Sequence, residues 1–195
     1  MSDRLEFFFF YGSTYTLMRI EEEAARAGVE VRWRSFNVRE IMIEDNIPFR
    51  DKPVKRRYMW RDVQRRSARY GVPFDRLPTY PVDPDLLANR VGVVAATEGW
   101  CPEYTRALYQ AWFLDDKLPG DREQLKVLLS DLGKDPDAVL ALADSPEIRA
   151  EYDRETDAAR KMGIFGSPTF AIGQEIFWGD DRLEDALEWR RSHPD

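Results

Sequence analysis

The hydrophobic pattern of the chain is most concentrated in residues 5–11, which end in five consecutive aromatic residues. Such a run of aromatic residues predicts a strand buried on both faces, and Gly12 ends it. From about Tyr15 to Gly28, apolar positions recur among charged ones at helical spacing, which predicts an amphipathic helix. Residues 29–36 then alternate apolar and polar side chains, as a half-exposed strand does. The start of the chain therefore predicts two parallel strands joined by a right-handed helical crossover.

Helical spacing dominates the middle of the chain. Residues 37–53 include two prolines and are predicted to be irregular. We expect helices at residues 55–70, 86–99, 102–114, 122–132, 136–143 and 145–162, with a proline-rich loop at 72–84. The first of these helices is strongly basic, and Gly71 is expected to end it.

The pattern changes again after residue 162. Residues 163–178 predict two short strands around a Gly173-Gln174 turn, and Gly179-Asp180-Asp181 is expected to open a final helix. This order of elements is that of an α/β, thioredoxin-like fold with a large all-helical insertion. We therefore expect residues 1–40 and 163–195 to form the thioredoxin-like domain, and residues 41–162 to form the insertion.

Composition narrows the classes of function. A chain of 195 residues suits one domain with an insertion, and its net charge of -7 argues against a general nucleic-acid binder. The sequence has no apolar run of membrane-spanning length and no signal-peptide layout, so we expect a cytoplasmic protein without membrane contact. The single cysteine, Cys101, excludes an internal disulfide or a CxxC pair, and the single histidine, His193, argues against a metal cluster.

Ser13 is the first candidate for chemistry. In thioredoxin-type folds, the first strand delivers a CxxC motif to the N-terminus of the first helix, where a thiolate is stabilised. Here that position reads Ser13-Thr14-Tyr15-Thr16, which has no sulfur, so disulfide exchange at this site is excluded. A hydroxyl can still donate a hydrogen bond to the thiolate of a ligand, and glutathione is the ligand that we expect. On local grounds alone, a plain helix N-cap is the commoner role of such a serine.

A second candidate lies near the other end of the chain, at Ser167-Pro168. In thioredoxin-type folds a proline entering this strand is cis and faces the active helix, which leaves the preceding backbone free to pair with a peptide-like ligand. An ordinary turn proline is the alternative. Asp180 and Asp181 are either an acidic pair at a helix start or acceptors for the ammonium group of a γ-glutamyl head.

Two further features have simpler interpretations. The basic helix is more often a solvated surface than a binding face, although Lys55 at its start could meet a ligand carboxylate. Cys101 lies before Pro102 near a helix start, but no histidine base is near it in sequence, so a buried structural role is favoured.

The chain resembles the family of 2-hydroxychromene-2-carboxylate isomerases and kappa-class glutathione transferases, within the DsbA-like thioredoxin superfamily. The resemblance covers most of the chain. It rests on Phe9-Phe10-Tyr11-Gly12-Ser13-x-Tyr15, Asn46-x-Pro48, Pro53-x-Lys55-x-x-Tyr58-Met59-x-x-Asp62, Tyr70-Gly71-Val72-Pro73, Gly163-Ile164-Phe165-Gly166-Ser167-Pro168-Thr169-Phe170 and Phe177-Trp178-Gly179-x-Asp181-Arg182-Leu183.

The resemblance also implies roles for individual residues. Ser13 would contact the glutathione sulfur. Asn46 and Lys55 would lie along the glutathione groove, with Asp62 orienting Lys55. The backbone of Ser167 before a cis Pro168 would pair with the cysteinyl unit, and Asp180 and Asp181 would hold the γ-glutamyl end.

The chain departs from this family at two places. Thr14 stands where family members usually have proline, and the second strand leads into Asn37-Val38-Arg39-Glu40 instead of a Pro-Phe and glycine-rich loop. That loop helps to form the substrate pocket, so the substrate need not be a hydroxychromene.

The sequence thus leads to one main hypothesis, a glutathione-dependent isomerase acting on a small electrophile from aromatic-ring cleavage. Tyr15, Trp60 and Trp112 are candidate pocket walls. A kappa-like transferase or peroxidase and a noncatalytic peptide-binding protein are the alternatives, and nucleic-acid binding through the basic helix is a distant third. Relatives of this type are often homodimers.

Overall fold

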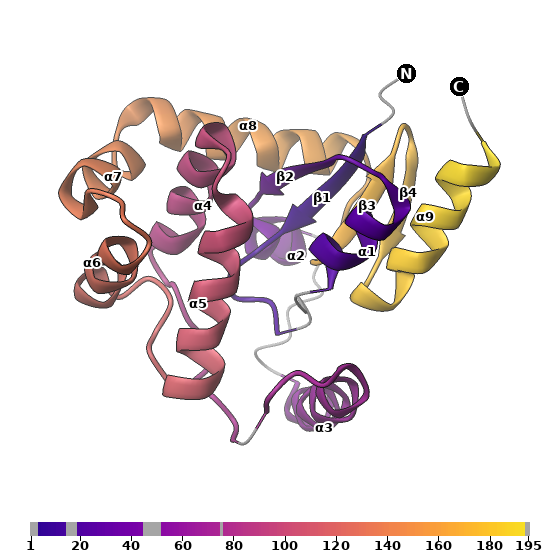
Figure 1. The fold of residues 1–195 in the computed structure, drawn as a ribbon, viewed down its shortest axis with the longest axis horizontal. Coiled ribbons are helices and arrows are strands. Elements are labelled where there is room, and N and C mark those ends of the chain that lie inside the picture. Colours follow the sequence, from indigo (N-terminus) through magenta and orange to yellow (C-terminus); the bar gives the residue numbers. More distant parts are fainter. Residues whose placement is uncertain (1–3, 15–18, 45–51, 75, 194–195) are drawn as a thin grey trace.

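The computed structural model describes residues 4–14, 19–44, 52–74 and 76–193. Their strands form one mixed sheet in the order β2-β1-β3-β4. The central strand β1 (Leu5–Phe9) pairs in parallel with β2 (Val31–Ser35) and antiparallel with β3 (Thr169–Ile172), which in turn pairs antiparallel with β4 (Glu175–Trp178). The first strand therefore lies between elements from opposite ends of the chain, as Figure 1 shows. This arrangement confirms the predicted strand–helix–strand unit and C-terminal hairpin.

Helices make up the rest of the described chain. They are α1 (Ile20–Ala27), α2 (Val38–Glu44), α3 (Pro53–Tyr70), α4 (Leu87–Glu98), α5 (Cys101–Asp115), α6 (Arg122–Asp131), α7 (Pro136–Ala143), α8 (Pro146–Lys161), the 3-10 turn η1 (Asp180–Arg182) and α9 (Leu183–Ser192). No strand interrupts the described residues between β2 and β3, which agrees with the predicted all-helical insertion. In the same described ranges, no helix combines the length and apolar character needed to cross a lipid bilayer.

The prediction for residues 37–53 was wrong over α2. Asn37 starts this helix, because the amide of Glu40 donates to its Oδ1 atom at 3.4 Å. Val38 and Ile41 are then buried one helical turn apart. The capping asparagine and the buried apolar pair outweigh the prolines, which come later in the segment.

The helix after β1 also begins later than expected. Helix α1 starts at Ile20 with Arg19 at its N-cap position, while residues 15–18 lie outside the described residues. Its end was predicted correctly, because Gly28 adopts a left-handed conformation (φ 64°) at the C-cap. Ser13 thus lies in the turn before α1 and is not its N-cap.

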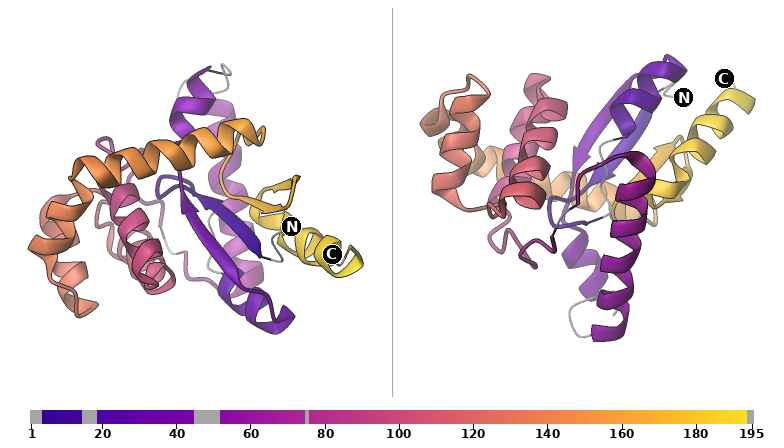
Figure 2. Two further views of the ribbon diagram at one scale, coloured as in Figure 1. Left: turned by 90° about the horizontal axis from the view of Figure 1, so that it is seen from above. Right: turned by 60° about the horizontal axis from the view of Figure 1, so that its bottom comes forward.

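Both faces of β1 are buried, as its aromatic run predicted. Phe7 and Phe9 pack on one face with residues of α1, α9, α4 and α5, and Phe8 and Phe10 pack on the other face with α2 and α8. Figures 1 and 2 show the sheet between these helices, with α6 and α7 lying beyond α4 and α5, away from the sheet. The larger core therefore runs without a break from the sheet into the insertion.

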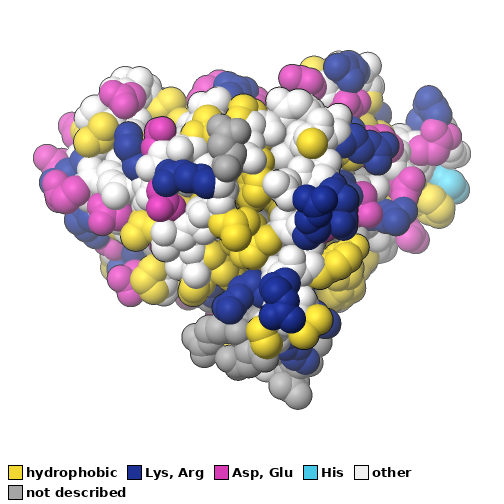
Figure 3. Space-filling view, turned by 90° about the horizontal axis from the view of Figure 1, so that it is seen from below, with side chains coloured by type: hydrophobic (Ala, Val, Ile, Leu, Met, Phe, Trp, Pro, Cys, Tyr) yellow, Lys and Arg dark blue, Asp and Glu magenta, His cyan; other side chains and the backbone are white. Residues whose placement is uncertain are grey.

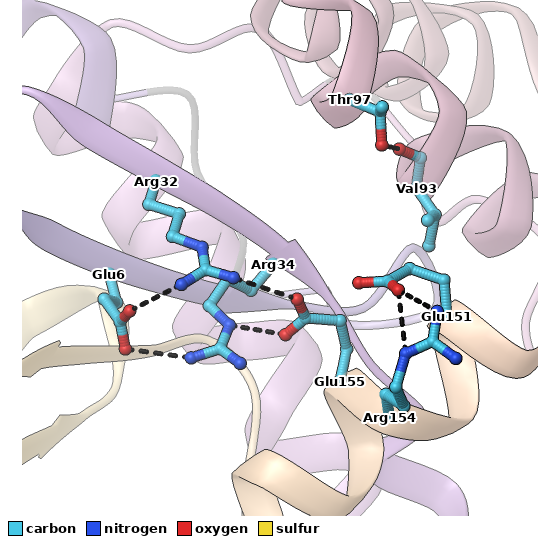
Figure 4. A network of polar contacts seen from close by, with 8 residues as sticks. All are labelled: Glu6, Arg32, Arg34, Val93, Thr97, Glu151, Arg154 and Glu155. Carbon is cyan, nitrogen blue, oxygen red and sulfur yellow. Dashed lines mark hydrogen bonds and ion pairs between the residues drawn. The ribbon is translucent and has the colours of Figure 1, made fainter. Parts of the chain in front are cut away.

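Ion pairs link α8 to the sheet (Figure 4). Arg34 of β2 lies between Glu6 of β1 and Glu155 of α8, with a 2.9 Å contact from Nη1 to Glu6 and a contact from Nε to Glu155. Arg32 adds a 3.4 Å contact to each of these two carboxylates. Because Arg34 and Glu155 are almost fully buried, each needs the other to offset its loss of water.

Candidate active site

Ser13 and Ser167 meet although 154 positions separate them in the sequence. The amide of Ser13 donates to the carbonyl of Phe10 at 2.9 Å, which closes the turn after β1. The Ser13 hydroxyl donates to the backbone carbonyl of Ser167 at 2.9 Å. The peptide bond between Ser167 and Pro168 is cis, as expected from the sequence. The hydroxyl therefore lies against the backbone that precedes the cis proline.

Two more hydroxyl groups belong to this part of the molecule. The Oγ atom of Ser167 and the Oγ1 atom of Thr14 are buried, and neither has a hydrogen-bond partner among the described residues. Buried hydroxyls are normally satisfied, so these two groups are available to bond a polar ligand. Their side chains belong to the same two segments that the Ser13 hydrogen bond joins.

A charged region continues from the cis proline. The amide of Gly179 donates to the Pro168 carbonyl at 2.9 Å, which places η1 next to the loop. Asp180 in η1 is almost fully buried and accepts two hydrogen bonds from Arg66 of α3, at 3.0 Å from Nε and 2.6 Å from Nη2. Burial raises the pKa of Asp180 to about 6, and the Arg66 charge opposes this rise. Asp181 is half exposed, with a carboxylate oxygen 3.9 Å from Arg66 Nη1.

Arginine side chains enclose an aromatic ring beside this pair. The guanidinium of Arg19 lies 4.0 Å from the centre of the Tyr70 ring, and that of Arg66 lies 5.7 Å from the same centre. Arg19 donates through Nη2 to Glu184, while its Nη1 is buried and has no hydrogen-bond partner in the part of the chain that the structure describes. A buried guanidinium nitrogen of this kind favours an anionic group nearby.

The structure gives less support to the site residues expected on or near the basic helix. Lys55 is exposed in the first turns of α3. The Asp62 carboxylate pairs with Arg65 at 2.8 Å, and the described residues show no Asp62–Lys55 pair, so Asp62 has a different partner from the one expected. Asn46 lies outside the described residues. Figure 3 shows several Lys and Arg side chains on the face of the molecule to which α3 contributes.

Cys101 has the structural role that the sequence favoured. It is 1% exposed beside Tyr11 and Thr105, and burial raises the pKa of its thiol to about 12. Trp112 is buried in the core, so its place as a pocket wall is not supported. Trp60 is half-buried and contacts Phe74 and Tyr80, while Tyr15 lies outside the described residues.

Sequence reasoning did not identify Arg19, Arg66 or Tyr109 as site residues. Arg66 was one cation among many in the basic helix, and Arg19 was one among the charged residues of an amphipathic helix. The hydroxyl of Tyr109 in α5 donates to the Ser13 carbonyl at 2.8 Å, a contact across 96 positions. No local pattern marks such long-range partners.

Comparison with known proteins places these features in context. The model of a family described as "DSBA-like thioredoxin domain" matches residues 5–188. A 2-hydroxychromene-2-carboxylate isomerase of Pseudomonas putida is 28% identical over 187 residues, covering 92% of this chain and 90% of the relative. Glutathione s-transferase kappa 2 of Caenorhabditis elegans is 26% identical over 155 residues, covering 70% and 67%. The solved structure of a 2-hydroxychromene-2-carboxylate isomerase superposes with a TM-score of 0.83 at 25% identity, covering 96% of this chain and 94% of that one.

Proposed function

Because the chain belongs to the DsbA-like thioredoxin family, we propose that it is a glutathione-dependent isomerase in which the Ser13 hydroxyl stabilises the thiolate of bound glutathione. Similarity to isomerases and to a kappa-class transferase supports an enzyme of this group. The hydrogen bond from Ser13 Oγ to the Ser167 carbonyl carries the proposal, because it places the hydroxyl against the cis-proline backbone. A cysteinyl unit pairing with Ser167 has its sulfur within reach of that hydroxyl.

The residues around Ser13 suit the ligand. The unpartnered hydroxyls of Thr14 and Ser167 can bond to its peptide groups. An α-amino acid head carries an ammonium and a carboxylate, so it needs charges of both signs. Asp181 offers an exposed acceptor for the ammonium, and Arg19 offers a buried donor for the carboxylate.

The remaining candidate residues would bind the two ends of the ligand. We assign Asp180 to the γ-glutamyl end through Arg66, whose position its two hydrogen bonds fix. Lys55 would attract the glycyl carboxylate of the ligand from its exposed position on α3. Asn46 and Asp62 stay predictions from the family resemblance.

In this proposal, glutathione supplies a thiolate that adds to an electrophilic carbon and leaves again. On binding, the Ser13 hydroxyl turns its single proton from the Ser167 carbonyl to the glutathione sulfur, and this hydrogen bond favours the charged form of the thiol and lowers its pKa. No protein thiol competes with it, because Ser13 and Thr16 stand where a CxxC motif has its two cysteines, and Cys101 is buried. The backbone of Ser167 holds the ligand in place, so the chain contributes orientation and charge stabilisation.

A kappa-like transferase or peroxidase is the second candidate, and the similarity to the Caenorhabditis elegans protein favours it. The two reactions differ in their use of glutathione. An isomerase returns the thiol unchanged, whereas a transferase or peroxidase consumes it. Loss of free thiol during turnover with ring-cleavage products therefore separates them. A reaction that depends on a reduced thiol suits the cytoplasm, which is where we place this protein.

Calorimetric titration with glutathione and S-methylglutathione tests the proposal. Ser13→Ala should weaken glutathione binding roughly tenfold above the pKa of the bound thiol, because it loses a hydrogen bond to a charged atom. It should leave S-methylglutathione binding unchanged, since that ligand has no ionisable thiol. Ser192→Ala, near the end of α9, is the matched control and should bind like the wild type. Failure of the wild type to bind glutathione at millimolar concentration would refute the proposal.

A further inference from the structure

We propose that Tyr109, in helix α5 of the insertion, is a positioning residue that fixes the turn carrying Ser13 and so sets where its hydroxyl meets a thiolate. This inference rests on the function proposed above. It assigns to the helical insertion a part in the chemistry of a site built on the thioredoxin-like sheet.

The contacts of Tyr109 hold the turn at both ends. Its hydroxyl donates to the Ser13 carbonyl at 2.8 Å and lies 3.4 Å from the Phe10 carbonyl. The Phe10 carbonyl also accepts the Ser13 amide, so one tyrosine hydroxyl reaches the first and last residues of the same turn. The shorter distance identifies the Ser13 carbonyl as its main acceptor.

Neighbouring side chains hold the Tyr109 ring in place, so the position of its hydroxyl is well defined. The residue is 6% exposed. Its ring centre lies 5.8 Å from that of Trp112, 5.9 Å from that of Phe113 and 6.2 Å from that of Tyr11. A ring held on several sides has little rotamer freedom to lose when its hydroxyl forms a bond.

Holding the carbonyl also holds the peptide plane that follows Ser13. In a trans peptide, the C=O and the next N–H point in opposite directions. A Ser13 carbonyl directed toward α5 therefore turns the Thr14 amide away from α5. Within the described residues, the amide, carbonyl and hydroxyl of Ser13 bond to Phe10, Tyr109 and Ser167 respectively. Of these three contacts, the one from Tyr109 comes from the insertion.

Tyr104 offers a matched control on the same helix. It is fully buried, and its hydroxyl donates to a backbone carbonyl at 3.1 Å, but the acceptor is Ala88 of α4. Tyr104→Phe and Tyr109→Phe thus remove the same atom from the same kind of bond, and Tyr109→Phe alone changes the turn. A merely structural role for Tyr109 predicts that the two variants behave alike.

The first measurement is amide hydrogen exchange without ligand. Tyr109→Phe should speed exchange of the Ser13 amide roughly tenfold relative to both the wild type and Tyr104→Phe, since the Phe10–Ser13 turn opens more often. Equal protection of this amide in all three proteins would overturn the inference, and this result does not depend on whether the proposed function is correct.

The second measurement is the ultraviolet absorbance of the thiolate of bound glutathione, titrated against pH, together with calorimetry. Tyr109→Phe should raise the pKa of the bound thiol and weaken glutathione binding roughly fivefold, with S-methylglutathione binding unchanged. Faster exchange with an unchanged thiol pKa would overturn the positioning role. Absence of glutathione binding by the wild type would instead refute the proposed function, and with it this inference.

Discussion

At Asp180, burial and a neighbouring arginine act on one carboxyl group in opposite directions. Burial is the larger effect and raises its pKa to about 6, while Arg66 favours the charged form. The same carboxylate orients Arg66 beside the cis-proline loop. The protonation state of one residue therefore affects the arrangement of the charged end of the site.

This raised pKa predicts a pH dependence of stability. Between the ordinary value for aspartate and about pH 6, the folded protein binds a proton at Asp180 that the unfolded chain does not. The wild type therefore gains stability relative to Asp180→Asn as the pH falls from about 7 to about 5. Urea unfolding of both proteins across this range measures the difference. Asp153→Asn, at an exposed position of α8, is the control and should keep the wild-type pH dependence. A response of Asp180→Asn parallel to that of the wild type would contradict the assignment.

Cys101 gives a second prediction at this scale. Its thiol is buried, with a pKa raised to about 12, so the reactive thiolate is scarce and shielded at neutral pH. The folded protein should resist alkylation and react fully once denatured. Mass spectrometry after iodoacetamide treatment tests this, and rapid labelling of the folded protein would be the contrary result. Thiol assays on the native protein then report added glutathione alone.

At the scale of elements, local signals decided several helix ends. Ser145 caps α8 by accepting from the Ile148 amide at 3.2 Å, and Gly71 ends α3 with a φ of 67°. Both residues are recognisable in the sequence. How α8 is attached to the sheet depends instead on Arg34, which meets carboxylates from two other elements.

Glu155→Gln tests this attachment. The substitution removes a charge from the almost fully buried pair with Arg34, so the free energy of unfolding should fall by about 2 kcal/mol. Glu151→Gln is the control on the same helix. Its pair with Arg154 (Figure 4) joins exposed side chains and should contribute less than about 1 kcal/mol. Denaturant unfolding compares the two variants. Equal losses would show that the buried network does not anchor α8.

At the scale of the whole molecule, the sheet and the insertion share one hydrophobic core. Phe7 and Phe9 of β1 belong to the same apolar cluster as Leu87 of α4 and Leu108 of α5. The rings of Tyr11 and Tyr104 meet edge to face, with centres 5.3 Å apart. The predicted division at residues 40 and 163 therefore describes the order of elements in the chain and does not mark separate cores.

A shared core predicts cooperative unfolding. The sheet and the insertion should unfold in one transition, because separating them would expose the apolar cluster that they share. Tryptophan fluorescence, which reports on Trp33 in the sheet and Trp112 in the insertion, should coincide with far-ultraviolet circular dichroism across a urea titration. Two separated transitions would show that the insertion is an independent domain.

The sequence by itself determined the elements, their order and the first half of the site. Apolar periodicity, capping residues and turn glycines act within a few positions, so strand β1, most of the helices and the Ser13 turn could be predicted locally. Helix α2 was missed because Pro48 and Pro53, which follow it in the sequence, outweighed the Asn37 cap in the local pattern. Tertiary structure alone decided which distant groups meet. It brought the Ser13 hydroxyl to Ser167, Arg66 to Asp180 and the Tyr109 hydroxyl to the Ser13 turn. The physical reason is that these bonds join residues about 100 positions or more apart, whose distance depends on packing of the whole chain.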